Sequence, residues 1–297
     1  MRADAPRDDK VSIIQGSGSG HEPAHVMAVG PGMLDAACPG DVFAAPPSDY
    51  VYETSKLLAS DKGILHIINN YTGDRMAFDM GRELAEAEDI KIATIIVDDD
   101  VAVKDSTYTV GRRGVAGNFF VIKAVGAASE NGASLEEIVA LGNRVNSVTR
   151  TMGMALTSCT PPAKGSPLFD LGDDEMEMGV GIHGEPGRRR VKLASADDIA
   201  AELTGSILKD LSLRRGAEVL LLVNGFGGTP LLELYLMVNS ARKVLEGAGV
   251  RAIRYLTGSY VTSLEMAGCS ITVSAADDTT LPLWDAPVHT PVLRWGM

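Results

Sequence analysis

Residues 63–97 read GILHIINNYTGDRMAFDMGRELAEAEDIKIATIIV, and this stretch decides the fold class. GILHII (63–68) and IKIATIIV (90–97) are short apolar runs rich in β-branched residues, typical of strands that are buried on both faces. Between them, residues 74–88 repeat apolar side chains at a spacing of about 3.6, which predicts an amphipathic helix. A strand, a helix and a second buried strand form a βαβ unit, so we expect an α/β fold.

The same alternation extends along the chain on both sides of this unit. In the first half we expect a strand at 11–16, a helix around 55–60, a helix at 118–130, and another from Ser134, whose spacing to Glu137 is that of a capping box. In the second half we expect helices at 195–211 and 229–249, and strands at 217–225, 251–258 and 269–276. Thr229 and Pro230 predict the N-cap and first turn of the longer helix.

The chain is long enough for two domains. It has 297 residues, and a domain holds roughly 150 residues on average. TSCTPPAKGSPLFDLGDDE (157–175) has paired prolines, glycines and an acidic run, which are typical of linkers and exposed loops. We therefore predict two α/β domains with mixed sheets flanked by helices, the first spanning 1–155 and the second spanning 156–297.

Composition argues against several classes of partner. The chain has 27 Lys and Arg against 39 Asp and Glu, for a net charge of -12, whereas nucleic acids and anionic membranes require a basic surface. Apolar runs such as VLLLV (219–223) are far shorter than the roughly 20 residues that span a bilayer, and MRADAPRDDK at the N-terminus lacks the apolar core of a signal peptide. The three cysteines are far apart and form no CxxC pair, which favours reduced thiols in the cytoplasm and no cysteine metal site.

Two glycine-rich loops each contain a histidine and a Glu-Pro pair. They read GSGSGHEPAH (16–25) and GVGIHGEPG (179–187). Glycines permit unusual backbone angles and let a small ligand approach the main chain. Tight turns with incidental histidines are the alternative interpretation. The occurrence of one such loop in each predicted domain favours a ligand site containing His21 and His183.

Acidic and glycine-rich loops follow several of the expected strands. Asp74 ends NYTGD (70–74) at the carboxyl end of a strand, where ligands gather in α/β proteins. On position alone, however, the preferred interpretation is that Asp74 or Thr72 caps the next helix. The carboxylates of DDDVAVKDS (98–106) are able to bind Mg²⁺, but a solvated loop that caps and turns is the preferred interpretation. NGFGGTP (224–230) precedes a helix yet lacks the spacing of phosphate-binding motifs, so nucleotide binding is weakly supported.

Seven motifs in order along the chain carry a specific resemblance. They are GSGHEP, NYTGD, DDDVAVKDS, GRRGVAG, GVGIHGEPG, TPLLELY and LWDAPVHTPVLRWG. In this order and spacing the chain resembles, over essentially its whole length, the dihydroxyacetone-binding subunits of dihydroxyacetone kinases. The resemblance implies a kinase subunit that carries the site for a short ketose and has neither a nucleotide site nor a metal of its own.

The resemblance also implies roles for individual residues. His183 would add through a ring nitrogen to the C2 carbonyl of dihydroxyacetone and hold it as a covalent hemiaminal, which a neutral imidazole is able to do. Asp74 would accept the proton of the terminal hydroxyl that is phosphorylated, and His21 would hydrogen-bond the substrate and act in acid–base steps. Gly18, Ser19 and Gly20 would hold the ligand hydroxyls. Asn69 occupies a substrate-side position where the family often has lysine.

The resemblance further implies partners. The phosphoryl donor would be ADP or ATP with Mg²⁺ on a separate helical nucleotide-binding subunit, which a phosphocarrier of the phosphotransferase system rephosphorylates, and the chain itself would form a homodimer. Family members usually have a further segment before RADAP, which here follows Met1 directly, so we expect the packing of the first helix to differ. Two other functions remain open: a kinase subunit for another ketose such as erythrulose, and a noncatalytic dihydroxyacetone sensor that activates a transcription regulator.

Overall fold

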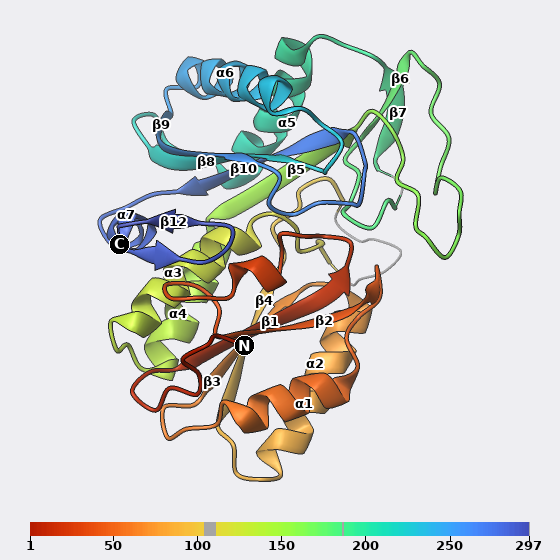
Figure 1. The fold of residues 1–297 in the computed structure, drawn as a ribbon. Helices are drawn as coiled ribbons and strands as arrows, with labels where there is room; N and C mark the ends of the chain where they lie inside the picture. The colour runs from red at the N-terminus through yellow and green to blue at the C-terminus, as the bar shows by residue number, and fades with distance from the viewer. Residues whose placement is uncertain (104–110, 186, 297) are drawn as a thin grey trace.

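Two β-sheets with helices packed against them form the molecule (Figure 1). The computed structural model describes residues 1–103, 111–185 and 187–296. The first sheet has the strand order β2-β1-β3-β4, and the second has the order β7-β6-β5-β10-β8-β9. The first is parallel throughout, whereas the second combines a parallel pair, β8 with β9, with antiparallel pairs. The predicted α/β fold with helix-flanked sheets is confirmed, and the second sheet is mixed as predicted, whereas the first is not.

The first sheet is covered on both faces. Its strands are β1 (Ser12–Ser19), β2 (Ala36–Val42), β3 (Ile64–Asn69) and β4 (Ile92–Val97), with helices α1 (Ser48–Leu57), α2 (Thr72–Glu86), α3 (Asn118–Glu130) and α4 (Leu135–Ser147). Ile14 on β1 packs in a core cluster with residues of α1 and α2, while its neighbour Ile13 joins the cluster that contains α3 and α4. Successive side chains of a strand point to opposite faces, so burial on both faces explains the continuous apolar runs in the sequence.

The second sheet begins earlier in the chain than the predicted boundary. Its strands are β5 (Thr149–Ala155), β6 (Glu175–Met178), β7 (Arg189–Lys192), β8 (Glu218–Gly225), β9 (Arg251–Gly258) and β10 (Gly268–Ala275), and α5 (Ala196–Leu211) and α6 (Leu231–Gly247) pack together on one side (Figure 1). Strand β5 ends at Ala155 and lies between β6 and β10, so the sheet changes before Thr149. The domain division at 155/156 itself stays a prediction.

The C-terminal segment returns to the first half of the molecule. Helix α7 (Thr280–Asp285) packs against α3, and the short strands β11 (Val288–His289) and β12 (Arg294–Trp295) pair with each other. A short 3-10 helix, η1 (Val26–Ala28), lies near this segment, because the Val292 N–H donates to the Met27 carbonyl at 3.2 Å. Within the described part of the chain, no helix is both long and apolar enough to cross a bilayer.

One predicted helix cap is confirmed and another is wrong. Ser134 and Glu137 form a reciprocal capping box at the start of α4. At α6, however, the N-cap is Pro230, and no side chain caps the helix. The Thr229 hydroxyl instead donates to the Gly268 carbonyl and accepts from the Gly268 N–H, both at 2.7 Å. Thr229 therefore ties the loop before α6 to β10 and is not available to the helix.

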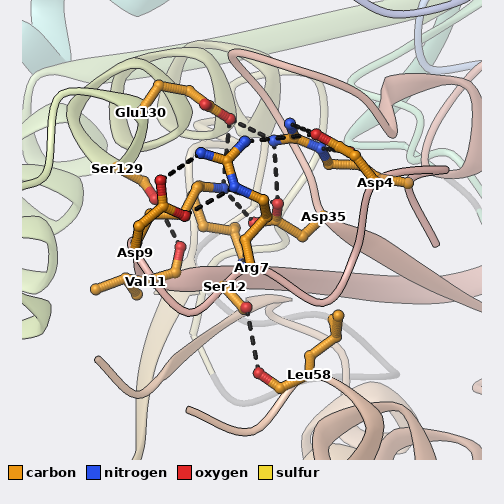
Figure 2. Close-up of polar contacts among 12 residues, drawn as sticks. Asp4, Arg7, Asp9, Val11, Ser12, Asp35, Leu58, Ser129 and Glu130 are labelled. Carbon is orange, nitrogen blue, oxygen red and sulfur yellow. Dashed lines mark hydrogen bonds and ion pairs between the residues drawn. The ribbon is translucent and has the colours of Figure 1, made fainter. Parts of the chain in front are cut away.

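The N-terminal segment is held by a buried ionic cluster where strands β1 and β2 begin (Figure 2). Asp35 is buried, and its two carboxylate oxygens each lie 2.7 Å from the Lys10 ammonium. Arg2 is also buried and pairs with Asp4, Asp35 and Glu130. Such buried charges are tolerated only when they are paired, so the cluster joins the RADAP segment to β2 and α3.

Candidate functional site

The site lies at the carboxyl edge of the first sheet. Because β1 and β3 are parallel neighbours, the loops that follow them, GSGHEP and NYTGD, emerge at the same edge. A pocket of about 670 Å³ opens there between the two halves of the chain. It is lined by Val42, Phe43, Ala45, Tyr71, Thr72, Gly73, Asp74, Pro161, Leu168, His183, Gly184 and Glu185.

His21 lies in the wall behind this pocket. Its ring is fully buried, and Nδ1 lies 2.8 Å from the Thr262 carbonyl oxygen, so Nδ1 carries a proton and donates it. Nε2 then presents a lone pair, and it has no hydrogen-bond partner among the described residues. Burial, aided by nearby His183, lowers the pKa of His21 to about 3. His21 is therefore a neutral imidazole with a free acceptor nitrogen at neutral pH.

His183 lines the pocket and is surrounded by aromatic rings. Its ring centroid lies 4.4 Å from that of Tyr71, 4.7 Å from that of His21 and 5.5 Å from that of Phe43, each in an edge-to-face arrangement. Burial first, and then the positive charge of Arg113, lower the pKa of His183 to about 3. The ring is thus held in one orientation and is neutral throughout the physiological range.

The two histidine loops use the same local device. In the first loop the Gly20 N–H donates to Glu22 Oε2 at 2.8 Å, and in the second the His183 N–H donates to Glu185 Oε2 at 2.9 Å. In each loop the glutamate of the Glu-Pro pair accepts from the residue two positions before it. The repeated pattern in the sequence therefore corresponds to two closed turns that meet at one pocket.

Asp74 is the third group at this site. It is the third residue of α2, whose N-cap is Tyr71, and no side chain caps that helix. The carboxylate of Asp74 instead accepts a hydrogen bond from the Ser17 hydroxyl at 2.7 Å and is only 3% exposed. Burial raises the pKa of Asp74 to about 7, although the bond from Ser17 opposes this shift. A carboxylate with a pKa near neutral pH is suited to accept a proton, which separates Asp74 from the capping alternative.

The remaining predicted substrate-binding residues lie near the pocket but outside its described lining. Gly18 and Gly20 pack against the segment around Phe43. An added Cβ at Gly18 would clash with the backbone there, and Gly20 has a positive φ of 96° that favours glycine. The Ser19 hydroxyl donates to the Gly40 carbonyl at 2.7 Å. Asn69 is fully buried and accepts from the Asn118 amide at 3.3 Å, while its own Nδ2 has no partner among the described residues. Their role in binding stays a prediction.

The acidic stretch after β4 forms a structural loop in its described part. The Asp99 carboxylate accepts from the N–H groups of Val115 and Gly117, at 2.8 and 2.7 Å, just before α3. Asp100 pairs with Arg113. Asp99 and Asp100 are buried and no described side chain caps α3, so the expectation of a solvated, capping loop is wrong for these two residues, whose carboxylates bind backbone N–H groups and an arginine instead. Residues 104–106 of the motif lie outside the described residues.

NGFGGTP also has a structural task. The side-chain oxygen of Asn224 accepts from the N–H groups of Tyr260 and Val261, and its amide donates to the Val261 carbonyl. These hydrogen bonds fix the segment just before Thr262, whose carbonyl oxygen accepts the hydrogen bond from His21 Nδ1. The first residue of the NGFGGTP motif thus helps to hold the segment that orients His21.

Sequence reasoning missed four residues that shape the site. Tyr71 and Phe43 enclose His183, and Glu185 and Arg113 hold its loop. Tyr71, Arg113 and Glu185 lie inside motifs that carried the family resemblance, so those motifs were the available signal. Phe43 had none, since its contact depends on the path of the chain after β2.

Comparisons with known proteins agree with this geometry. A family model described as the Dak1 domain matches residues 1–292. The Listeria innocua protein named PTS-dependent dihydroxyacetone kinase 1, dihydroxyacetone-binding subunit, is 51% identical over 285 residues, which cover 96% of this chain and 87% of that protein. The D-erythrulose kinase of Mycolicibacterium smegmatis is 36% identical over 296 residues, covering 100% of this chain and 51% of that protein.

Among solved structures, the dihydroxyacetone kinase operon co-activator DhaQ matches with a TM-score of 0.90 at 34% identity, covering 96% of this chain and 88% of that one. Sequence and structure comparisons therefore lead to the same family. The chain belongs to the Dak1 family, as its seven motifs predict.

Proposed function

We propose that this protein is the dihydroxyacetone-binding subunit of a dihydroxyacetone kinase and that it holds its ketose covalently on His183. The observation that carries the proposal is the meeting of a neutral His183, a neutral His21 and a buried Asp74 around one pocket. The name of the Listeria relative supports the same substrate.

Capture of the ketone uses the free nitrogen of His183. Its lone pair attacks the C2 carbonyl, a C–N bond forms and the C=O π bond breaks. The carbonyl oxygen gains a proton, and the other ring nitrogen, which carries the N–H, gives one up, so the adduct is neutral. His21 relays that proton in this scheme. Support comes from its Nε2, which has no partner among the described residues, and from its ring centroid, which lies 4.7 Å from that of His183. Glycerol has the same hydroxyls but no carbonyl, so this chemistry rejects it.

Asp74 serves the second step. Its carboxylate accepts the proton of the terminal hydroxyl as that oxygen attacks the phosphoryl group, and a pKa of about 7 leaves a large ionised fraction at neutral pH. Gly18, Ser19, Gly20 and Asn69 hold the remaining hydroxyls in this scheme. A three-carbon ketose fills little of a pocket of about 670 Å³, which leaves space for the donor to enter.

The donor belongs to other subunits. ADP or ATP with Mg²⁺ on a separate nucleotide-binding subunit supplies the phosphoryl group, and a phosphocarrier protein of the phosphotransferase system regenerates it. The words "PTS-dependent" in the name of the Listeria relative support this route. The protein itself acts as a homodimer in the cytoplasm.

Two other functions are separable from this one. The D-erythrulose kinase relative favours a four-carbon ketose as an alternative substrate, and the co-activator structure favours a sensor. A sensor needs capture alone, so the buried Asp74 with its raised pKa favours catalysis.

The first test is direct observation of the adduct. Dihydroxyacetone labelled with carbon-13 at C2 should lose its carbonyl resonance and give a tetrahedral carbon when it binds the wild-type protein. Intact-protein mass spectrometry under mild ionisation should show the matching mass increase. His183→Ala should abolish both signals, because it removes the nucleophile, and erythrulose added as a competitor shows which ketose fits.

The controls separate the alternatives. Asp74→Asn should form the adduct and fail to support phosphorylation when the partner subunits are present. Wild-type protein that is saturated with ligand and shows no tetrahedral carbon would refute covalent capture. A normal rate of phosphorylation by Asp74→Asn would refute the assignment of the base.

A further inference from the structure

We propose that Arg113 is a positioning residue for His183, because one buried guanidinium holds both ends of the loop that presents this histidine. The inference rests on the proposed capture of a ketose by His183. It concerns a residue that is not itself part of the described pocket lining and that reaches this lining through Glu185.

Arg113 contacts the loop at its beginning and near its end. Its Nη2 donates to the Gly179 carbonyl at 2.7 Å, four residues before His183, and its Nη1 lies 3.3 Å from Glu185 Oε1, two residues after it. Its Nε donates to Asp100 Oδ2 at 2.8 Å, on the loop after β4. The arginine thus connects the first half of the chain to the loop in the second half.

Glu185 transmits this contact to the histidine. One carboxylate oxygen faces Arg113, and the other accepts the N–H of His183 at 2.9 Å. The bridge therefore requires both oxygens. At Gly181, inside the same loop, an added Cβ would clash with Glu185 and Arg113, so the loop is shaped around this ion pair.

Burial makes the arrangement strict. Arg113 is 1% exposed, Asp100 2% and Glu185 6%. A buried carboxylate without a cation is strongly unfavourable, so the two acids hold the guanidinium in one place, and the guanidinium holds Glu185 against the backbone of His183. Lysine cannot replace it, since the planar fork of arginine makes several directed bonds at once.

The charge of Arg113 also acts on the ring of His183. It is the second cause of the lowered pKa of His183, after burial. Removing the charge should therefore raise that pKa, whereas a loss of stability elsewhere in the protein should leave it unchanged. This provides a readout that requires no ketose.

The experiment compares wild type with Arg113→Met, Arg113→Lys, Glu185→Gln and the control Arg112→Met. Arg112 is the adjacent residue and also an ion-paired arginine, but its partner is Asp210 on α5. Two properties are measured on the folded proteins: the titration of the His183 ring by NMR without ligand, and the rate of adduct formation with labelled dihydroxyacetone.

We expect Arg113→Met to raise the pKa of His183 and to slow adduct formation at least tenfold, with Arg113→Lys restoring the pKa but only part of the rate. Arg112→Met should match wild type in both. Glu185→Gln keeps the shape of the side chain but removes a buried charge and leaves one acceptor oxygen in place of two. It should therefore also slow adduct formation. This variant tests the proposal even if Arg113→Met does not fold.

Two results overturn the proposal: a folded Arg113→Met with the wild-type titration and rate, or a Glu185→Gln with the wild-type rate. If the wild type forms no adduct, the proposed function fails. The positioning role of Arg113 is then tested without ketose, by comparing wild type and variants in the titration of the His183 ring and in the contacts of that ring with Tyr71 and His21 in nuclear Overhauser spectra.

Discussion

Burial shifts the pKa values of two groups at the site in opposite directions. For a carboxylic acid the charged form is the deprotonated one, and for imidazole it is the protonated one, so removal from water raises the pKa of Asp74 and lowers that of His183. The result is an acceptor with a pKa of about 7 beside a nucleophile with a pKa of about 3. One apolar pocket thus prepares both groups.

This separation predicts two different pH profiles. Adduct formation needs neutral His183 and should be nearly constant from pH 5 to pH 8, as an estimate from its pKa of about 3. Phosphorylation needs ionised Asp74 and should rise with pH through about 7. Single-turnover measurements of each step, with the partner subunits in excess for the second, test this.

Two results would contradict these pH profiles. If capture loses its rate between pH 7 and pH 6, His183 is protonated there, and its environment is more polar than the buried rings suggest. If phosphorylation is flat across pH 7, Asp74 is not the group whose ionisation limits transfer. Ser17→Ala offers a matched change, since loss of its bond to Asp74 should move the phosphorylation profile to higher pH.

At the scale of elements, local pattern predicted the buried strands and missed the polar ones. The spacing of apolar residues in the sequence is enough to predict strands β3 and β4 and helix α2. Strand β2 contains Pro39 and Gly40, which weaken a strand pattern, and it lies at a sheet edge. Strands β6 (EMEM) and β7 (RRVK) are only four residues long and contain charged residues. Strand β7 is an exposed edge strand, where charged residues are common, whereas β6 lies inside the sheet. Their pairing depends on contacts with residues that are distant in the sequence, so a short stretch of sequence does not reveal it.

The candidate site shows the same limit. His21, His183 and Asp74 were predicted from glycine-rich and strand-end loops, because such loops place side chains at a sheet edge. The contacts that orient them were not predictable in this way. Thr262 lies 241 residues from His21 in the chain, and Arg113 lies 72 residues from Glu185.

Strand β8 offers a test of this remote support. Asn224, near its end, satisfies two N–H groups and one carbonyl in the segment 260–261. Asn224→Ala leaves these buried groups without that partner, which should cost about 1–3 kcal/mol of unfolding free energy. Since Thr262 would lose its fixed position beside His21, adduct formation should also slow. Urea unfolding and the adduct rate measure the two effects.

Ser134→Ala is the control for this variant. It removes the capping box of α4 and should cost about 1 kcal/mol without slowing capture, because no contact joins that cap to the described pocket lining. If both variants slow capture in proportion to lost stability, Asn224 acts through stability alone, and the proposed support of His21 is wrong.

At the scale of the whole molecule, each half holds the histidine loop of the other. His21 belongs to the first half and is fixed by Thr262 of the second, whereas the loop of His183 belongs to the second half and is fixed by Arg113 of the first. Helix α3, buried from Asn118 to Ser129, packs in a core cluster with residues of both sheets. The pocket therefore exists only when the two halves are docked.

Four histidines, three of them buried and His183 half-buried at the pocket, also set how the stability of the whole protein responds to acid. Burial lowers the pKa of His21, His25, His66 and His183 to about 3, so the unfolded chain binds more protons at these positions below about pH 6.5. Their contribution to stability is complete above that pH and is lost as pH falls. Asp74, Asp99 and Asp100 have raised pKa values and act in the opposite direction.

Each of the four histidines makes a difference of up to one bound proton between the unfolded and the native state from about pH 6 to pH 4, and one proton is worth about 1.4 kcal/mol per pH unit. His66 isolates one of them, because it lies away from the pocket, and its partner Ser55 keeps a bond to the Val51 carbonyl. His66→Leu should therefore reduce the slope of unfolding free energy against pH by about 1.4 kcal/mol per pH unit. Urea unfolding at pH 6, 5 and 4 measures that slope, and a slope equal to that of the wild type would show that His66 is not buried in its neutral form.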